Sequence, residues 1–212
     1  MSVEYVEVLV EEPSMEAALR LVLPRLLEKV PFEIFPFQCK DDLLARLPQR
    51  MRGYANRKRS DPWFREHARV VVIVDRDDDR CEALKERLDR IARDAGLEVR
   101  LAGARHGWTV VNRLAIEELE AWYFGDWEAV RAAYPGVSAT VPSRAAFRDP
   151  DAIAGGTWEA FERVLQQAGY FATGLRKIEA ARAIAEHMDP TRNTSRSFQM
   201  LREIFHEMVA PA

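Results

Sequence analysis

The sequence predicts an α/β protein: a mostly parallel sheet flanked by helices, followed by a helical carboxyl-terminal extension. Strand-like and helix-like segments alternate over the first 125 or so residues, an order typical of a parallel sheet with helices on its faces. The segment "RVVVIVD", residues 69–75, is a nearly continuous apolar run, as expected of a strand covered on both faces. Strand-like patterns fade after Asp126, so we divide the chain into an α/β core, residues 1–125, and a helical extension, residues 126–212, packed on it as one unit.

The first two strands and the first two helices are predicted from the spacing of apolar residues and from the positions of Ser14, Pro24 and Pro36. "EYVEVLVE", residues 4–11, alternates and predicts the first strand. "PSMEAALRLVLPRLLEK" predicts a helix with Ser14 as its N-cap and a kink or break at Pro24. "FEIFPFQ", residues 32–38, predicts a second strand near an edge, because Pro36 cannot donate a hydrogen bond to a neighbour. "KDDLLARLPQRM" predicts the next helix.

The central strand at residues 69–75 is followed by a helix, two strands and a mainly helical tail. The helix "DRCEALKERLDRIARDAG" ends at Gly96, which predicts a C-cap. "LEVRLAG" and "WTVVNRLAI" predict strands, and "EELEAWYFGD" predicts the start of another helix. Residues 135–157 look irregular, and the helices expected after them cover residues 157–169, 174–188 and 195–208.

The composition is that of an ordinary globular protein. Hydrophobic residues make up 48% of the 212 residues, charged residues 31%, and the net charge is -3. No apolar run approaches the roughly 20 residues that a membrane span needs. The start, "MSVEYVEVLVEE", has neither the basic nor the apolar region of a signal peptide. We therefore expect a cytoplasmic protein without membrane contact.

Acidic residues gather after three of the expected strands, where an open α/β sheet binds its ligands. Carboxylates that lie so close together repel one another unless some are protonated or a cation binds them. Oxygen ligands without histidine or cysteine suit a hard cation, Mg²⁺ or Mn²⁺. The three clusters are Glu11 and Glu12; Asp75, Asp77, Asp78 and Asp79; and Glu117, Glu118 and Glu120.

A simpler interpretation applies to each acid taken alone. Acidic side chains at helix N-termini interact favourably with the helix dipole and cap free N–H groups. Three clusters together favour the metal, with Asp75 and Asp77 as ligands. Asp78 and Asp79 are assigned to capping of the helix that follows.

The segments "VLVEEPSMEAAL", "VVVIVDRDDDR" and "IEELEAWYFGD", in that order, resemble a TOPRIM-type domain. The arrangement is most similar to the TOPRIM domains of overcoming-lysogenization-defect (OLD) nucleases. The later segments "GGTWEAFERVLQQAGYF", "GLRKIEAARAIAEHMDP" and "SRSFQML" resemble the tail of a bacterial domain-of-unknown-function family grouped with these nucleases. The resemblance covers nearly the whole chain and implies a Rossmannoid, TOPRIM-like fold.

The resemblance also implies roles for particular residues. Glu11 matches a glutamate that acts as general acid/base or metal ligand, Asp75 and Asp77 match D-x-D metal ligands, and Glu118 and Glu120 match a later acidic pair. Lys177 is the cation that the family tail offers near a phosphate, although a lysine on a helix is more often simply solvated. Two positions depart from the pattern. Glu12 stands where glycine is usual, and Met15 stands where a second acid is frequent, which puts a second metal ion in doubt.

The function implied is phosphodiester hydrolysis of DNA or RNA with Mg²⁺ or Mn²⁺, as the effector of a phage-defence system. An alternative is a conditional or silent module that binds an ABC/SMC-type ATPase, since the chain has no GxxxxGK[ST] motif of its own. A D-x-D phosphatase or phosphotransferase fits less well, because that class carries the motif on its first core strand. A dinucleotide-binding fold fits least, because no glycine-rich turn follows the first strand.

Two basic segments are candidates for nucleic-acid contact. Residues 46–69 hold eight Arg or Lys against two acids, interleaved with aromatic residues. Cationic groups neutralise phosphates and aromatic faces stack on bases, although a solvated loop is an equal alternative. The second segment is "TRNTSRS", residues 191–197. The nucleic-acid-binding residues expected from the two segments are Arg52, Arg57, Lys58, Arg59 and Arg196.

Overall fold

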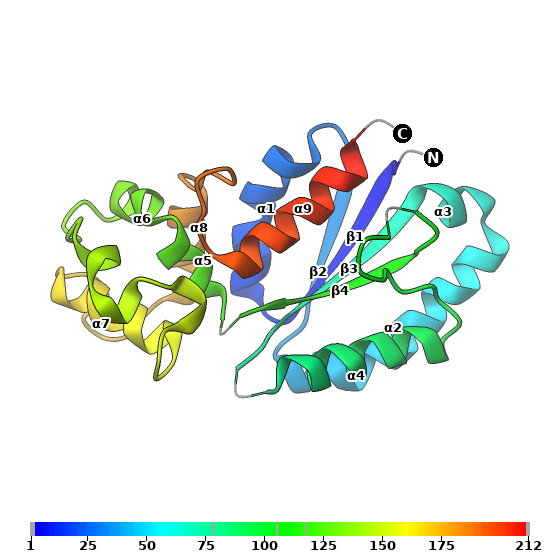
Figure 1. The fold of residues 1–212 in the computed structure, drawn as a ribbon, viewed down its shortest axis with the longest axis horizontal. Helices are drawn as coiled ribbons and strands as arrows, with labels where there is room; N and C mark the ends of the chain where they lie inside the picture. The colour runs from blue at the N-terminus through cyan, green and yellow to red at the C-terminus, as the bar shows by residue number, and fades with distance from the viewer. Residues whose placement is uncertain (1–2, 78, 105, 117, 211–212) are drawn as a thin grey trace.

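The computed structural model describes residues 3–77, 79–104, 106–116 and 118–210. In these residues, four strands form one sheet in the order β2-β1-β3-β4, and every pairing is parallel. The predicted α/β class with a mostly parallel sheet is confirmed, and Figure 1 shows helices on both sides of it. The strands are β1 (Tyr5–Val10), β2 (Phe32–Pro36), β3 (Ala68–Asp75) and β4 (Val110–Ala115).

The strand order decides which residues meet at the edge of the sheet. β1 pairs with both β2 and β3, and β3 pairs with β4, where Asp75 lies beside Ala115. Because all four strands run the same way, the segments after Val10, Pro36, Asp75 and Ala115 emerge at one edge. β2 is an edge strand, as the proline predicted.

Each face of the sheet is covered by its own helices. β3 is buried along its whole length, as its apolar run predicted. The apolar side chains of β1 and β3 alternate between two core clusters, one on each face. One face packs against α1 (Pro13–Leu27) and α9 (Arg196–Val209). The other packs against α2 (Lys40–Ser60), α3 (Pro62–His67) and α4 (Cys81–Asp94).

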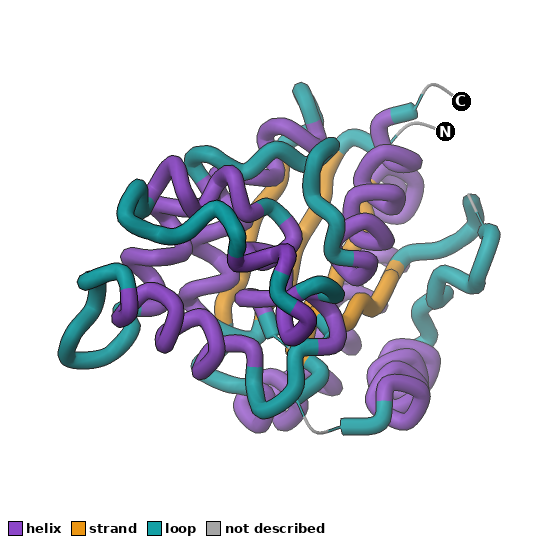
Figure 2. The backbone as a smooth tube through the Cα atoms, turned by 60° about the vertical axis from the view of Figure 1, so that its left-hand side comes forward, coloured by secondary structure: helices purple, strands orange, loops and turns teal. Residues whose placement is uncertain are grey.

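The remaining helices lie beyond the carboxyl ends of the strands, at the left of Figure 1, and the tube in Figure 2 shows the loops between them. Their buried side chains continue the cluster that includes α1 and α9, and α8 contacts α1 extensively. This places the helical extension directly over the edge where the acidic clusters emerge. The elements are α5 (Leu119–Gly125), α6 (Trp127–Ala133), three short 3-10 turns (Val141–Ser143, Ala145–Phe147, Pro150–Ala152), α7 (Thr157–Gln167) and α8 (Lys177–Ala185).

Several local predictions were wrong. α1 has Glu12 as its N-cap residue, while Ser14 lies inside the helix and donates its hydroxyl hydrogen to the Glu12 carboxylate. The helix continues through Pro24 to Leu27. Residues 97–103 make one isolated bridge, Val99 with Val110, and form no strand.

The basic segment before β3 is helical rather than a loop, because α2 runs to Ser60 and α3 follows directly. Its apolar residues have helical spacing and bury one side of α2 against the sheet. None of the described helices combines the length and apolar character needed to cross a membrane.

Candidate functional site

The first two predicted ligands lie side by side at the carboxyl edge. The Glu11 carboxylate accepts a hydrogen bond of 3.0 Å from the backbone N–H of Asp75. Both residues are buried, with 8% and 5% of their surface exposed. The parallel pairing of β1 with β3 brings these acids together across 64 residues of sequence.

Both carboxyl groups are held in an environment that disfavours their charge. Burial raises the pKa of Glu11 to about 7, with a contribution from Asp77, although the hydrogen bond from Asp75 opposes it. Burial, and next the charge of Glu11, raise the pKa of Asp75 well above its ordinary value. One oxygen of Asp75, Oδ1, is buried and accepts no hydrogen bond from any residue that the structure describes. The pair is therefore short of positive charge and of hydrogen-bond donors.

A third predicted ligand, Glu120, approaches from the first turn of α5. Its side chain is buried, and its Oε2 accepts no hydrogen bond within the described part of the chain. Burial raises the pKa of Glu120 to about 7, despite the opposing charge of Lys177. The hydroxyl of Tyr123, one turn further along α5, is also buried without a partner. The charge of Glu120 contributes to raising the pKa of Tyr123 well above 10, behind burial itself, so this phenol stays protonated.

Lys177, at the start of α8, supplies a positive charge to this group. Its ammonium nitrogen lies 3.7 Å from the Glu12 carboxylate and 5.5 Å from the centre of the Trp158 ring. Burial alone would lower the pKa of Lys177, but the charges of Glu120 and Glu12 outweigh it and the pKa is raised. The predicted cation is therefore at the acidic edge, and Lys177 is charged at neutral pH.

Asp77 is held at the same edge by a residue that the sequence did not single out. The ammonium of Lys40 lies 2.6 Å from the Asp77 carboxylate and 3.1 Å from that of Asp79, and it donates to the carbonyl of Arg76 at 3.1 Å. Asp77 has a φ of 47°, a left-handed conformation that is uncommon without glycine. The assignment of Asp79 as a helix cap is wrong, because its carboxylate binds Lys40 and α4 has no side-chain cap. Asp78 lies outside the described residues.

Glu118 has a structural partner. Its Oε2 accepts hydrogen bonds of 2.8 Å from the Thr157 hydroxyl and 2.9 Å from the Trp158 N–H, so it caps the start of α7. Glu118, Asp77 and Glu159 line a cavity of about 660 Å³ with the turn at residues 152–156. The Oε2 atom of Glu159 is buried there without a partner. Glu117, the remaining acid of this cluster, lies outside the described residues.

The chemistry of these residues fits a hard divalent cation. Asp75 Oδ1 and Glu120 Oε2 are buried oxygen acceptors without a donor, and a cation would relieve the repulsion that keeps neighbouring carboxyl groups protonated. Within the described ranges, however, no three His, Cys, Asp or Glu side chains are grouped closely enough to hold a metal ion. The structure thus brings the predicted ligands to one edge without assembling a finished coordination sphere.

The predicted nucleic-acid contacts on α2 lie far from this edge. Lys40 begins α2 at the acidic edge, and Lys58 follows about 27 Å along the helix at 1.5 Å per residue. Arg57 forms an ion pair of 3.1 Å with the buried Glu7, and Lys58 pairs with Glu98. Arg52 and Arg59 bind oxygen atoms of their own helix.

Two arginines of the segment also lie over aromatic rings, one ring from the segment itself and one from β2. The Arg57 guanidinium lies 4.3 Å from the centre of the Phe64 ring, and that of Arg50 lies 4.1 Å from the Phe35 ring. Arg196, the remaining predicted contact, begins α9 and lies 3.6 Å from Glu203. The loop before it is tied to α5 by hydrogen bonds from Asn193 and Thr194.

Sequence reasoning missed Lys40 and Tyr123. Lys40 follows β2 closely, and the parallel pairing of β2 with β1 sends that segment to the acidic edge, so the strand prediction contained a signal for it. Tyr123 lies three residues after Glu120, on the same side of a helix. The sequence predicted only that the segment with Tyr123 begins a helix, and the fold shows that its buried hydroxyl is acted on by the charges of Glu120, Glu12 and Asp75.

A family comparison matches residues 10–206 of the chain to a family described as "Domain of unknown function (DUF4276)". Comparisons with curated proteins and with solved structures found no match. The matched range includes all four strands in whole or part, the acidic edge and the helices that cover it. The chain belongs to the DUF4276 family.

Proposed function

We propose that this protein is a Mg²⁺- or Mn²⁺-dependent nuclease with a TOPRIM-type acidic site related to that of OLD nucleases. The observation that carries the proposal is the buried carboxylate group at one sheet edge. Glu11, Asp75 and Glu120 all have raised pKa values, and two of the three have an oxygen without a donor. Burying several acids without a counter-ion is costly, and a function that uses a cation explains why they are kept.

In this proposal, Glu11, Asp75 and Asp77 hold the ion, with Glu120 and the free oxygen of Glu118 on the side of α5. A divalent ion at such a site neutralises charge on a phosphate and lowers the pKa of a bound water. The carboxylates must move closer than they are in the metal-free arrangement to complete the coordination.

The other residues of the edge bind the substrate phosphate, hold a metal ligand in place or transfer a proton. Lys177 is charged and partly exposed beside Glu12, so it can bind a phosphate oxygen of the substrate. Lys40 holds the Asp77 carboxylate in place. Glu11, with a pKa of about 7, can accept or release a proton near neutral pH.

The test is a cleavage assay with purified protein on plasmid DNA, single-stranded DNA and RNA, with Mg²⁺, Mn²⁺ or EDTA. We expect nicking or cleavage of at least one substrate that requires the metal and falls by about 100-fold or more in Asp75→Asn. Asp94→Asn, at the exposed end of α4, is the matched control and should keep full activity. Absence of metal-dependent cleavage, or equal rates for Asp75→Asn and wild type, contradicts the proposal.

An ABC/SMC-type ATPase partner stays a prediction of the family resemblance alone. Within the described residues, the surface gives it no specific support.

A further inference from the structure

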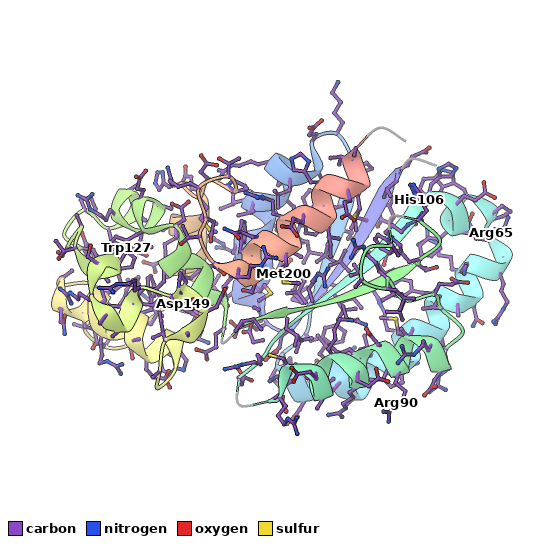
Figure 3. The ribbon with its side chains drawn as sticks, in the orientation of Figure 1. Arg65, Arg90, His106, Trp127, Asp149 and Met200 are labelled. Carbon is purple, nitrogen blue, oxygen red and sulfur yellow. The ribbon has the colours of Figure 1, made fainter. Side chains whose placement is uncertain are left out.

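A second polar site lies at the outer edge of β4, apart from the acidic edge. A cavity of about 440 Å³ opens between α4, β4 and α9. Leu101 and Met200 border it and are 67% and 39% exposed, large values for apolar side chains. Figure 3 labels Met200 on α9 above the edge strand and Arg90 on α4 below it. We call this cavity the β4 groove.

The β4 groove contains an arginine whose guanidinium has no partner. Arg113 projects into it from β4, yet it forms no hydrogen bond or ion pair with any described residue, and its Nε is buried. Burial, and next the neighbouring Arg100, lower the pKa of Arg113 to about 10. The guanidinium is therefore still charged at neutral pH, in a place that resists its charge.

The acids around the groove do not supply the missing partner. Glu203 and Glu207 face Arg113 from α9 and Asp89 faces it from α4, and they act on it only through longer-range attraction. Each is already paired with another base. The ion pairs are Lys85–Asp89 at 2.6 Å, Arg100–Glu207 at 2.6 Å and Arg196–Glu203 at 3.6 Å. The lining balances three bases against three acids, but the third acid, Glu203, pairs with Arg196 from outside the groove, which leaves Arg113 as a base that can accept an anionic ligand.

Arg113 points to the same face of the sheet as Asp75, although the β4 groove itself is lined from both faces, by α9 and by α4. Val71, Ile73, Val111 and Ala115 all belong to the core cluster under α1 and α9. Because side chains alternate along a strand, Asp75 and Arg113 point to that same face. Ala115 is the ladder partner of Asp75, and Arg113 stands two residues earlier, about 7 Å along the strand.

We propose that Arg113 binds a backbone phosphate of a single nucleic-acid strand that passes from the acidic edge over the outer edge of β4. A phosphodiester carries one negative charge per nucleotide, and arginine binds it through paired N–H donors. The inference rests on the proposed function for the identity of the ligand. In this inference the nucleic acid contacts Arg113, a few residues from the proposed metal ligands, rather than the basic residues predicted on α2.

Binding of a fluorescent single-stranded oligonucleotide tests this without catalysis. Anisotropy is measured in EDTA over a range of NaCl concentrations, with DNA and RNA of one sequence. Arg113→Met should weaken binding about tenfold at low salt and reduce the slope of log K against log salt by about 0.7, the value for one lost phosphate contact on a single strand. Arg113→Lys should keep the slope, because it keeps the charge.

Arg90→Met is the matched control, since Arg90 is an exposed arginine on α4. It should change affinity less than twofold. Thermal unfolding of each variant separates this role from a structural one. Arg113→Met removes a buried charge that has no ion pair and should leave the melting temperature unchanged or higher. If Arg113 instead stabilises the packing of α9, the substitution should lower the melting temperature.

Unchanged affinity and slope in Arg113→Met overturn the inference, as does failure of the wild-type protein to bind any oligonucleotide at low salt. If Arg113→Met lowers the melting temperature and leaves the salt dependence of binding unchanged, Arg113 stabilises α9 and the inference is also overturned. The binding assay and the cleavage assay can fail independently. If binding depends on Arg113 but no metal-dependent cleavage occurs, the phosphate contact is supported and the proposed nuclease activity is contradicted.

Discussion

The ammonium nitrogen of Lys40 lies 2.6 Å from the carboxylate of Asp77, so a lysine from the segment after β2 neutralises an acid from the segment after β3. The same ammonium reaches Asp79 and the carbonyl of Arg76, which together satisfy its three N–H donors. Lys40 is thus a counter-ion of the D-x-D segment. Any divalent ion that binds Asp77 competes with it.

Lys40→Met should therefore tighten Mn²⁺ binding several-fold, because the ion no longer competes with an ammonium for Asp77. It should also lower the free energy of unfolding of the metal-free protein by about 1 kcal/mol, the usual worth of a partly exposed charged contact. Mn²⁺ titration followed by electron paramagnetic resonance and urea unfolding measure the two effects. Weaker Mn²⁺ binding in Lys40→Met, with Lys40→Arg like wild type, would instead make Lys40 a residue that organises the site.

The raised pKa of Glu120 predicts how stability depends on pH. Its pKa is about 7 in the folded protein against 4.5 when unperturbed, so the folded state holds this proton more tightly than the unfolded state. The stability from Glu120 is present below pH 4.5 and is lost as pH rises toward and through 7, by up to about 3 kcal/mol. Urea unfolding of the metal-free protein between pH 4.5 and 8 should show this loss.

Glu120→Gln should make that loss smaller and should be more stable than wild type at pH 8, because the amide cannot ionise. Glu82→Gln, at an exposed position of α4, is the matched control, and its stability should depend on pH as that of wild type does. Identical pH profiles for Glu120→Gln and wild type would show that Glu120 ionises in the folded protein as it does in water.

Lys177→Met should reduce the rate of metal-dependent cleavage by about 100-fold at saturating substrate, because it removes the one charged lysine beside Glu12 and Glu120. In the same variant the pKa of Glu120 should rise further, since Lys177 opposes its increase. Initial rates against substrate concentration and against pH measure both. Lys29→Met, an exposed lysine after α1, serves as the control. A change in KM alone would assign Lys177 to substrate binding.

Gly125→Ala should destabilise the protein by about 2 kcal/mol or more, because α5 and the loop before α9 are in close contact there. A Cβ at Gly125 would lie 2.7 Å from the backbone nitrogen of Ser195 and closer still to the Asn193 side chain. These atoms belong to a hydrogen-bonded loop that has little room to move. Gly53→Ala, on α2 with open space around it, should be neutral or stabilising. Equal unfolding midpoints for the two variants would contradict this account.

The alternation of apolar runs and helical patterns was enough to predict the parallel sheet and the carboxyl edge. β3 illustrates why: a run of β-branched apolar residues is typical of a parallel strand covered on both faces, and all eight residues of β3 are buried. The strand prediction at residues 97–103 was wrong, because apolar alternation does not reveal whether a neighbour is available. The segment pairs with β4 at one point, where Val99 bridges to Val110 through backbone hydrogen bonds of Glu98 and Arg100, and the pairing does not continue into a ladder among the described residues.

The sequence by itself therefore determined which acids reach one edge, since parallel strands that end in acidic segments have no other arrangement. It did not determine what each acid contacts. Glu118 caps α7 and Asp79 binds Lys40 because partners more than 35 residues away in the chain pack beside them. Arg113 without an ion pair, and Asp75 Oδ1 without a donor among the described residues, arise in the same way. Burial and hydrogen bonding depend on neighbours from other elements, and only the tertiary structure brings those together.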